Sequence, residues 1–168
     1  GVVRVIKEKP ADATSLQRLG KAVLASKPLT YWRMHGKEEA VAVDTSPNGN
    51  NGTYEEGASP YSPDGKAGNL NGGRMRAELE LPADTYSVEL WFWNETPHHA
   101  RLVTGYIFSR GPDADKSATG DHLGIGGTHG AAGRLFLFNG NQRNQAIEGS
   151  TQLVPRTWNH VVMVRQKN

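Results

Sequence analysis

A polar, turn-rich stretch between Asp44 and Tyr54 constrains the fold of this chain more than any other segment. It reads Asp-Thr-Ser-Pro-Asn-Gly-Asn-Asn-Gly-Thr-Tyr and holds two Asn-Gly pairs beside a single carboxylate. Asn-Gly pairs favour the positive backbone φ of tight turns, and both proline and glycine interrupt helices. The stretch therefore predicts a loop in which several side-chain and backbone oxygens share one neighbourhood.

Composition supports strands and turns along the rest of the chain. Its 168 residues suffice for one domain with a sizeable core, and its 20 glycines and 9 prolines are spread along the sequence. This pattern suits short strands joined by many turns, so the sequence predicts an all-β domain. The net charge is only +2, the basic residues are scattered, and no apolar run reaches the length of a membrane span. We therefore expect neither a nucleic-acid partner nor direct insertion into a membrane.

One helix is predicted near the N-terminus. Four apolar residues share one helical face over residues 14–26: Leu16, Leu19, Val23 and Leu24. A capping box of Thr14 and Gln17 precedes this face, and Pro28 stops it. The apolar face predicts packing on the body of the domain, and the alternative is a linker helix that belongs to a neighbouring domain. Residues 1–6 alternate weakly and form a candidate strand.

Apolar and polar residues alternate from residue 29 onward, as is typical of strands. The predicted strands are residues 29–34, 40–43, 75–81, 86–93, 101–110, 134–138, 142–147 and 158–165. Asn139-Gly140 predicts a tight hairpin turn, and a Gly- and Asp-rich loop is expected after Arg110. In the last strand we expect Trp158 in the core and His160 lining the sandwich.

Five segments match, in order, the pattern of one known family. They are residues 22–33 (Ala-Val-Leu-Ala-Ser-Lys-Pro-Leu-Thr-Tyr-Trp-Arg), 65–72 (Gly-Lys-Ala-Gly-Asn-Leu-Asn-Gly), 86–92 (Tyr-Ser-Val-Glu-Leu-Trp-Phe), 108–111 (Phe-Ser-Arg-Gly) and 158–164 (Trp-Asn-His-Val-Val-Met-Val). Together with the Asp44 loop they resemble the laminin-G-like family, which belongs to the concanavalin-A-like lectin and glucanase jelly rolls. The resemblance implies an antiparallel jelly-roll β-sandwich at residues 29–168, preceded by an N-terminal extension with a short helix at residues 1–28.

The chain departs from this family at two places. Asn71 stands where the family has an aspartate, and the family continues after its W-H-H-V strand with further strands, whereas this sequence stops at Asn168. By the resemblance, the domain is expected to lack its C-terminal strands and to leave an open sheet edge beside residues 158–165. We expect residues 1–6 to add to that edge, or the chain to self-associate as a domain-swapped dimer.

The loop after Asp44 is the candidate metal site. Calcium takes about six to eight oxygen ligands, and Asp44, Asn48 and Asn50 could supply oxygens beside the turn carbonyls. The resemblance implies the same cation, because structural calcium is common in laminin-G-like domains. The alternative is that Asp44 makes an Asx-turn and the Asn-Gly pairs only supply positive φ, since a lone carboxylate binds calcium poorly.

Glu89, Trp91 and Trp93 form the candidate carbohydrate-binding site. Alternate residues of a strand share a face, and flat indole rings beside a carboxylate can stack on sugar rings while the carboxylate bonds their hydroxyls. The alternative is that one or both tryptophans pack under the predicted helix or under a crossing loop.

No catalytic residues are predicted. Concanavalin-like glucanases carry a tight E-x-D-x-x-E set, because two carboxylates must flank one glycosidic bond. Between Glu89 and Glu95 the middle aspartate is missing, and six residues of strand separate the two carboxylates by about 20 Å. The sequence also contains no G-x-S-x-G elbow and no H-E-x-x-H motif.

These observations predict a non-catalytic recognition module that binds carbohydrate or protein. The alternatives, in order, are a structural spacer with no ligand and a glycan-active enzyme of the glucanase type. The resemblance alone implies an accessory domain of a larger bacterial protein outside the cytoplasm, whether periplasmic, on the cell surface or secreted. A contiguous exposed aromatic patch would favour binding over the spacer.

Overall fold

The computed structural model describes residues 2–6, 13–34, 40–60, 67–82, 84–112, 120–140 and 145–166. Its backbone contacts divide the chain into two compact units. The first, which we call the sandwich unit, consists of Gly1–Lys9 and Pro82–Asn168. The second, the helical unit, consists of Pro10–Leu81. The helical unit is thus inserted in the sequence between two parts of the sandwich unit.

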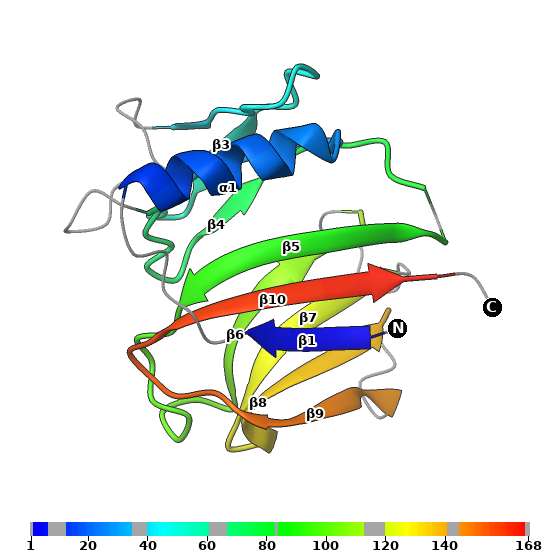
Figure 1. Ribbon diagram of the computed structural model, residues 1–168. Coiled ribbons are helices and arrows are strands. Elements are labelled where there is room, and N and C mark those ends of the chain that lie inside the picture. The colour runs from blue at the N-terminus through cyan, green and yellow to red at the C-terminus, as the bar shows by residue number, and fades with distance from the viewer. Residues whose placement is uncertain are drawn as a thin grey trace. The chain divides into compact units, whose positions relative to one another are not determined.

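The sandwich unit consists of two antiparallel sheets (Figure 1). Its strands are β1 (Val2–Ile6), β5 (Tyr86–Trp93), β6 (Val103–Ser109), β7 (Asp121–Gly127), β8 (Gly130–Asn139), β9 (Ile147–Gln152) and β10 (Trp158–Arg165). The front sheet has the order β1-β10-β5, and the back sheet has the order β6-β7-β8-β9. The expected all-β architecture with antiparallel sheets and one short helix is therefore confirmed.

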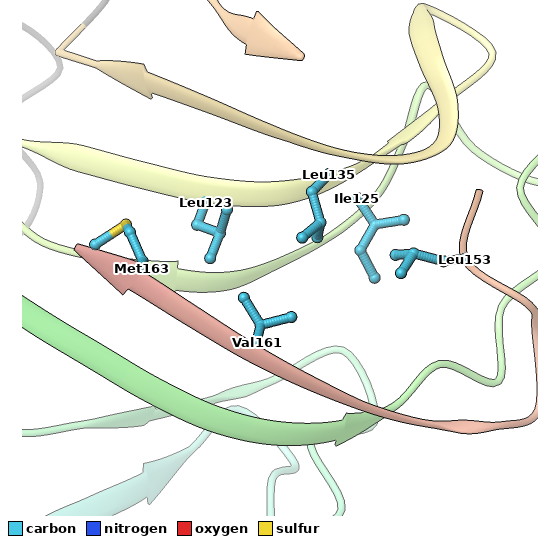
Figure 2. Close-up of a cluster of buried hydrophobic side chains, with 6 residues drawn as sticks. All are labelled: Leu123, Ile125, Leu135, Leu153, Val161 and Met163. Atoms are coloured by element: carbon cyan, nitrogen blue, oxygen red, sulfur yellow. The ribbon is translucent and has the colours of Figure 1, made fainter. Parts of the chain in front are cut away.

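The core of the sandwich unit lies between the two sheets and draws side chains from both (Figure 2). Its buried members are Leu123, Ile125, Leu135, Leu153, Val161 and Met163. Leu123 and Ile125 lie two residues apart on β7, so both face the same side of the back sheet. Between them, a Cβ on Gly124 would lie 2.6 Å from Cζ of Phe136. Glycine at this position leaves room for an aromatic ring on the outer face of the back sheet.

β1 lies at the edge of the front sheet, beside β10 (Figure 1). The two strands are antiparallel, with Val2 opposite Val164 and Ile6 opposite His160. Five consecutive residue pairs form this ladder. The prediction that the N-terminal residues add as a strand to the edge beside the last strand is confirmed for residues 2–6.

The helical unit combines one helix with a small sheet. α1 (Ala13–Ala25) is followed by β2 (Val41–Ala42), β3 (Gly52–Glu55) and β4 (Arg74–Arg76), and the sheet has the order β2-β3-β4. The predicted helix is confirmed, but its apolar face is only partly covered, because Leu16 and Leu24 are exposed while Leu19 and Val23 are half-buried. Leu16 and Leu24 line an open cavity of about 230 Å³.

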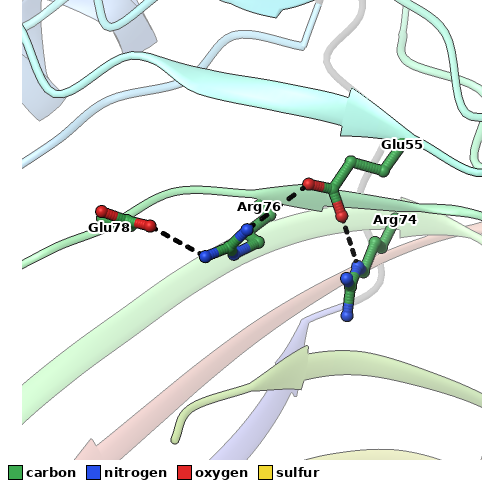
Figure 3. Close-up of polar contacts among 4 residues, drawn as sticks. All are labelled: Glu55, Arg74, Arg76 and Glu78. Carbon is green, nitrogen blue, oxygen red and sulfur yellow. Dashed lines mark hydrogen bonds and ion pairs between the residues drawn. The ribbon is translucent and has the colours of Figure 1, made fainter. Parts of the chain in front are cut away.

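Exposed ion pairs connect β3 and β4 (Figure 3). The Glu55 carboxylate lies 2.7 Å from Nε of Arg74 and 3.7 Å from Nη1 of Arg76. Arg76 also bonds Glu78 at 2.8 Å. Solvent-exposed pairs of this kind each contribute about 1 kcal/mol or less, so the register of this sheet depends chiefly on its backbone hydrogen bonds and packing.

Four of the predicted strands need correction. Within residues 29–34 only Trp32 forms a bridge, to Asp44, because the Asp44 side chain bonds the Tyr31 N–H. β4 ends at Arg76 rather than at residue 81, although half-buried and exposed residues keep alternating to that point. β8 begins at Gly130 rather than at residue 134. Of the described residues 145–147 of the predicted return strand, only Ile147 is extended, as the first residue of β9. Two strands, β3 and β7, were not predicted.

Some predictions fall outside the described residues. They include most of the Gly- and Asp-rich loop, at 113–119, and residues 142–144 of the predicted return strand. Over the part of the chain that the structure describes, no helix is both long and apolar enough to cross a membrane.

Candidate functional site

The predicted carbohydrate-binding residues lie together on the outer face of the front sheet. Val88, Leu90 and Phe92 pack against the core. Because side chains alternate along a strand, Glu89, Trp91 and Trp93 share the opposite face. Their neighbours on β10 follow from the register, in which Trp91 is opposite His160 and Trp93 is opposite Trp158. The structure thus places two cross-strand aromatic pairs side by side, and we call these four residues the aromatic row: Trp91, Trp93, Trp158 and His160.

The first pair of the aromatic row is a stack. The rings of Trp91 and His160 lie 4.4 Å apart between centroids and are tilted by only 11°. Nε2 of His160 lies 2.8 Å from Oε1 of Glu89, so the carboxylate holds the imidazole in this orientation. The Glu89 side chain itself remains about half exposed. The His160 side chain is only 12% exposed, so this end of the row offers chiefly an oriented carboxylate.

The second pair of the aromatic row meets edge to face. Trp93 and Trp158 have centroids 5.9 Å apart and planes inclined by 67°. The indole Nε1 of Trp93 donates a hydrogen bond to Glu95, whose carboxylate lies 3.2 Å from Nε of Arg156. Trp93 keeps 46% of its surface exposed. Its orientation is thus fixed by neighbours while much of the ring remains accessible.

The positions of Trp158 and His160 differ from the prediction. Both were expected at the core, yet the core-facing residues of β10 are Val161 and Met163, which are buried. Trp158 and His160 alternate with these residues and so face outward. Both sets are largely apolar, and the sequence pattern therefore could not tell which face of β10 is buried. The register with β5 makes them the two members of the aromatic row that the sequence analysis missed.

The Asp44 carboxylate, in the helical unit, accepts four hydrogen bonds. Oδ1 accepts the backbone N–H groups of Tyr31 and Ser46, at 2.8 and 2.9 Å. Oδ2 accepts the Ser46 hydroxyl and the N–H of Asn50, also at 2.8 and 2.9 Å. In return, the Asp44 N–H donates to Oδ1 of Asn51. The carboxylate thereby connects the backbone at Tyr31 to Ser46 and Asn50, the two ends of the turn that follows Asp44.

The two asparagines of the candidate calcium site face the preceding segment. Nδ2 of Asn48 donates to the carbonyls of Pro28 and Leu29, and Nδ2 of Asn50 donates to the same Leu29 carbonyl. Among the described residues, no three His, Cys, Asp or Glu side chains gather in a metal-binding arrangement. The geometry accounts for Asp44, Asn48 and Asn50 as loop-fastening residues, which is the Asx-turn alternative, and calcium binding there stays a prediction.

The surroundings of Asp44 also set its ionisation. Burial raises the pKa of this carboxyl, but hydrogen bonds from Tyr31, Ser46 and Asn50 lower it, and the net result is a pKa below the usual value. The folded state therefore favours the ionised form. Its contribution to stability is present above the unfolded-state pKa of about 3.9 and is lost as the pH falls through the folded-state value.

We expect Asp44→Ala to lower the free energy of unfolding by about 2–4 kcal/mol, because several partly or fully buried donors lose their acceptor. Thermal melts at neutral and acidic pH measure the contribution of the Asp44 hydrogen bonds to stability. Melts with chelator and with excess calcium measure calcium binding. Calcium binding would raise the melting temperature of the wild type and not that of the variant. Glu56→Ala, an exposed acid in the same unit, is the matched control. Equal melting temperatures for Asp44→Ala and wild type would contradict the loop-fastening role.

A second polar cluster lies at one end of the sandwich unit and was not predicted. Asp121 is 4% exposed and accepts hydrogen bonds from the Tyr86 hydroxyl, Asn139 Nδ2 and Arg165 Nη1. Burial, together with the bond to Asp121 and its negative charge, raises the pKa of Tyr86 to about 12, against an opposing effect of Arg110. An open cavity of about 290 Å³ adjoins Asp121 and Arg165. Because Asp121 and Arg165 neutralise each other, we assign this cluster a structural role.

Comparisons of the chain with protein-family models, with curated proteins and with solved structures gave no match. Its function is therefore argued from the geometry of its own residues.

Proposed function

We propose that the sandwich unit is a recognition module that binds carbohydrate on the outer face of the front sheet. The observation that carries this proposal is the aromatic row, in which the accessible ring of Trp93 lies beside carboxylates and an imidazole. An exposed tryptophan ring held beside charged side chains favours a binding module over a structural spacer. A glycan-active enzyme of the glucanase type remains the third candidate, after the recognition module and the spacer.

The physical basis is the fit between flat rings and sugar rings. The exposed ring of Trp93 can cover the apolar C–H face of a sugar, while Glu89 and Glu95 can accept hydrogen bonds from its hydroxyls. Because cross-strand contacts already orient the rings, little side-chain entropy is lost on binding.

A carbohydrate suits this surface better than a protein does. The cores of protein–protein interfaces are depleted in charged residues and exclude water. Here the exposed charged groups of Glu89, Glu95 and Arg156 lie directly beside the rings. A hydroxylated ligand can use those groups, whereas an apolar protein surface would have to desolvate them. A protein ligand is the second candidate of the proposal.

The proposal extends to the fold family and to the setting of the protein. The paired antiparallel sheets and the aromatic strand pair support a laminin-G-like, concanavalin-A-like jelly roll. On that reading, the chain is an accessory part of a larger bacterial protein located outside the cytoplasm, with calcium as its structural cation.

Truncating the accessible ring tests the proposal. In a glycan array followed by titration calorimetry on the full chain, we expect Trp93→Ala to weaken binding about tenfold or more, as loss of a central aromatic contact does. Trp93→Phe keeps a flat ring and should retain part of the affinity. Tyr106→Ala is the matched control, because Tyr106 is 47% exposed on the outer face of the back sheet and lies outside the aromatic row.

Two outcomes would contradict the proposal. One is the absence of any glycan ligand on the array while the chain is folded, as judged by its thermal melt. The other is equal loss of affinity in Trp93→Ala and Tyr106→Ala, which would place the ligand elsewhere or indicate a general loss of structure.

A further inference from the structure

β1 reaches its place in the front sheet from a distant part of the sequence. It pairs with β10 over the five residue pairs from Val2 with Val164 to Ile6 with His160. Within the sandwich unit, however, the next strand along the chain is β5, which begins at Tyr86. The entire helical unit, Pro10–Leu81, lies between them in sequence. β1 is therefore not joined to its partner by a tight hairpin, which would have fixed the pairing locally.

The edge of β10 that β1 covers is a template for an extended segment. β5 pairs with the other edge of β10, so removal of β1 would expose unpaired backbone N–H and C=O groups. Val2–Ile6 reads Val-Val-Arg-Val-Ile, and β-branched residues of this kind favour strands. The ladder depends on these residues and their register, and a second copy of the chain carries the same residues.

We infer that the edge of β10 also accepts β1 from a second copy of this chain, which gives a reciprocal strand-exchanged dimer. Each copy then makes the ladder already seen within one chain, so no additional interface is required. What changes is chiefly the entropy: association costs translational freedom, whereas pairing within one chain requires β1 to return to β10 across the intervening helical unit. Because exchange joins two molecules, the dimer fraction is expected to increase with the protein concentration at refolding.

The first test is the mass of the full chain in solution. The chain is unfolded, refolded at a series of concentrations and measured by light scattering. We expect a dimer whose fraction rises with the concentration at refolding. Successive N–H groups of a strand point to opposite sides, so one of the variants Val3→Pro and Arg4→Pro removes an N–H that faces β10, and that variant should lose the dimer. A monomer at every concentration would overturn the inference.

The second test identifies the contact, using the absence of cysteine from the sequence. Arg4 and Val162 are register partners, so chains carrying Arg4→Cys and Val162→Cys are mixed, refolded together and oxidised. We expect a covalent dimer at several times the yield from Arg4→Cys with Tyr106→Cys, whose second thiol lies on the back sheet. A chain carrying both Arg4→Cys and Val162→Cys shows how much disulfide forms when β1 pairs with β10 of the same copy. A dimer by light scattering whose crosslink yield does not exceed the control would show a different interface and overturn the inference.

Discussion

Replacing Asp121 by alanine is expected to lower the free energy of unfolding by about 2–4 kcal/mol, because a buried carboxylate that accepts three hydrogen bonds is removed, whereas its partner Arg165 is 36% exposed and can be hydrated. The carboxylate is nearly inaccessible and accepts hydrogen bonds from Tyr86, Asn139 and Arg165. Its removal leaves a guanidinium and a phenol without their acceptor in a partly buried place. Urea unfolding followed by tryptophan fluorescence measures the loss, because three of the four tryptophans belong to the sandwich unit.

The surface ion pair between Arg134 and Glu148 provides the control. Its atoms lie 3.1 Å apart, and both side chains are well exposed. Glu148→Ala should therefore cost about 1 kcal/mol or less. A loss of similar size in the two variants would contradict the structural role that we assign to the Asp121 cluster.

Tyr86 offers an independent readout of the same cluster. Its folded-state pKa of about 12 lies above the usual value near 10, so the neutral phenol stabilises the fold below pH 10, and this contribution is lost as the pH rises to 12. Ultraviolet titration of the wild type should show a late-titrating tyrosine. In Asp121→Ala the hydrogen bond and the negative charge are both absent, and the pKa of Tyr86 should fall.

Leu123→Ala is expected to cost about 3–5 kcal/mol, from lost apolar transfer and from the cavity that the smaller side chain leaves. Leu123 is 0% exposed and lies in the centre of the core between the two sheets. Leu102→Ala removes the same atoms from a side chain that is 66% exposed, so it should change stability by about 0.5 kcal/mol or less. Urea unfolding of the two variants gives the comparison. If both lost the same amount, the core would not lie where the structure places it.

The best-predicted elements were those in which the apolar residues follow a single spacing, either that of a strand or that of a helix. The alternation of residues 86–93 predicted β5 to the residue, and a single apolar stripe with a proline stop predicted α1. β7 was missed because glycine at 124, 126 and 127 hides the alternation of Leu123 and Ile125. Glycine is required at these positions because other atoms lie where a Cβ would be, as the Phe136 ring does at Gly124. Such a neighbour comes from another strand, so the local sequence gives no sign of it.

In the candidate site, too, contacts between distant parts of the chain could not be predicted from the local sequence. Alternation placed Glu89, Trp91 and Trp93 on one face of a strand, but their partners His160 and Trp158 depend on a register between strands about seventy residues apart. At Asp44 the sequence left two readings open, since a polar loop can hold a cation or bond its own backbone. Only the positions of the Tyr31 and Asn50 N–H groups show how fully the carboxylate is engaged.

The division of the chain has a consequence for how the protein responds to a cut. Because Gly1–Lys9 and Pro82–Asn168 form one unit, the helical unit is tethered at both of its ends. A single cut between the units leaves the helical unit joined to the sandwich unit through the other crossing. If that cut lies between β1 and the helical unit, the piece that carries β1 stays attached to the rest of the protein by its ladder with β10 alone. A single nick on one side of the insertion would thus turn an intramolecular strand into a dissociable ligand.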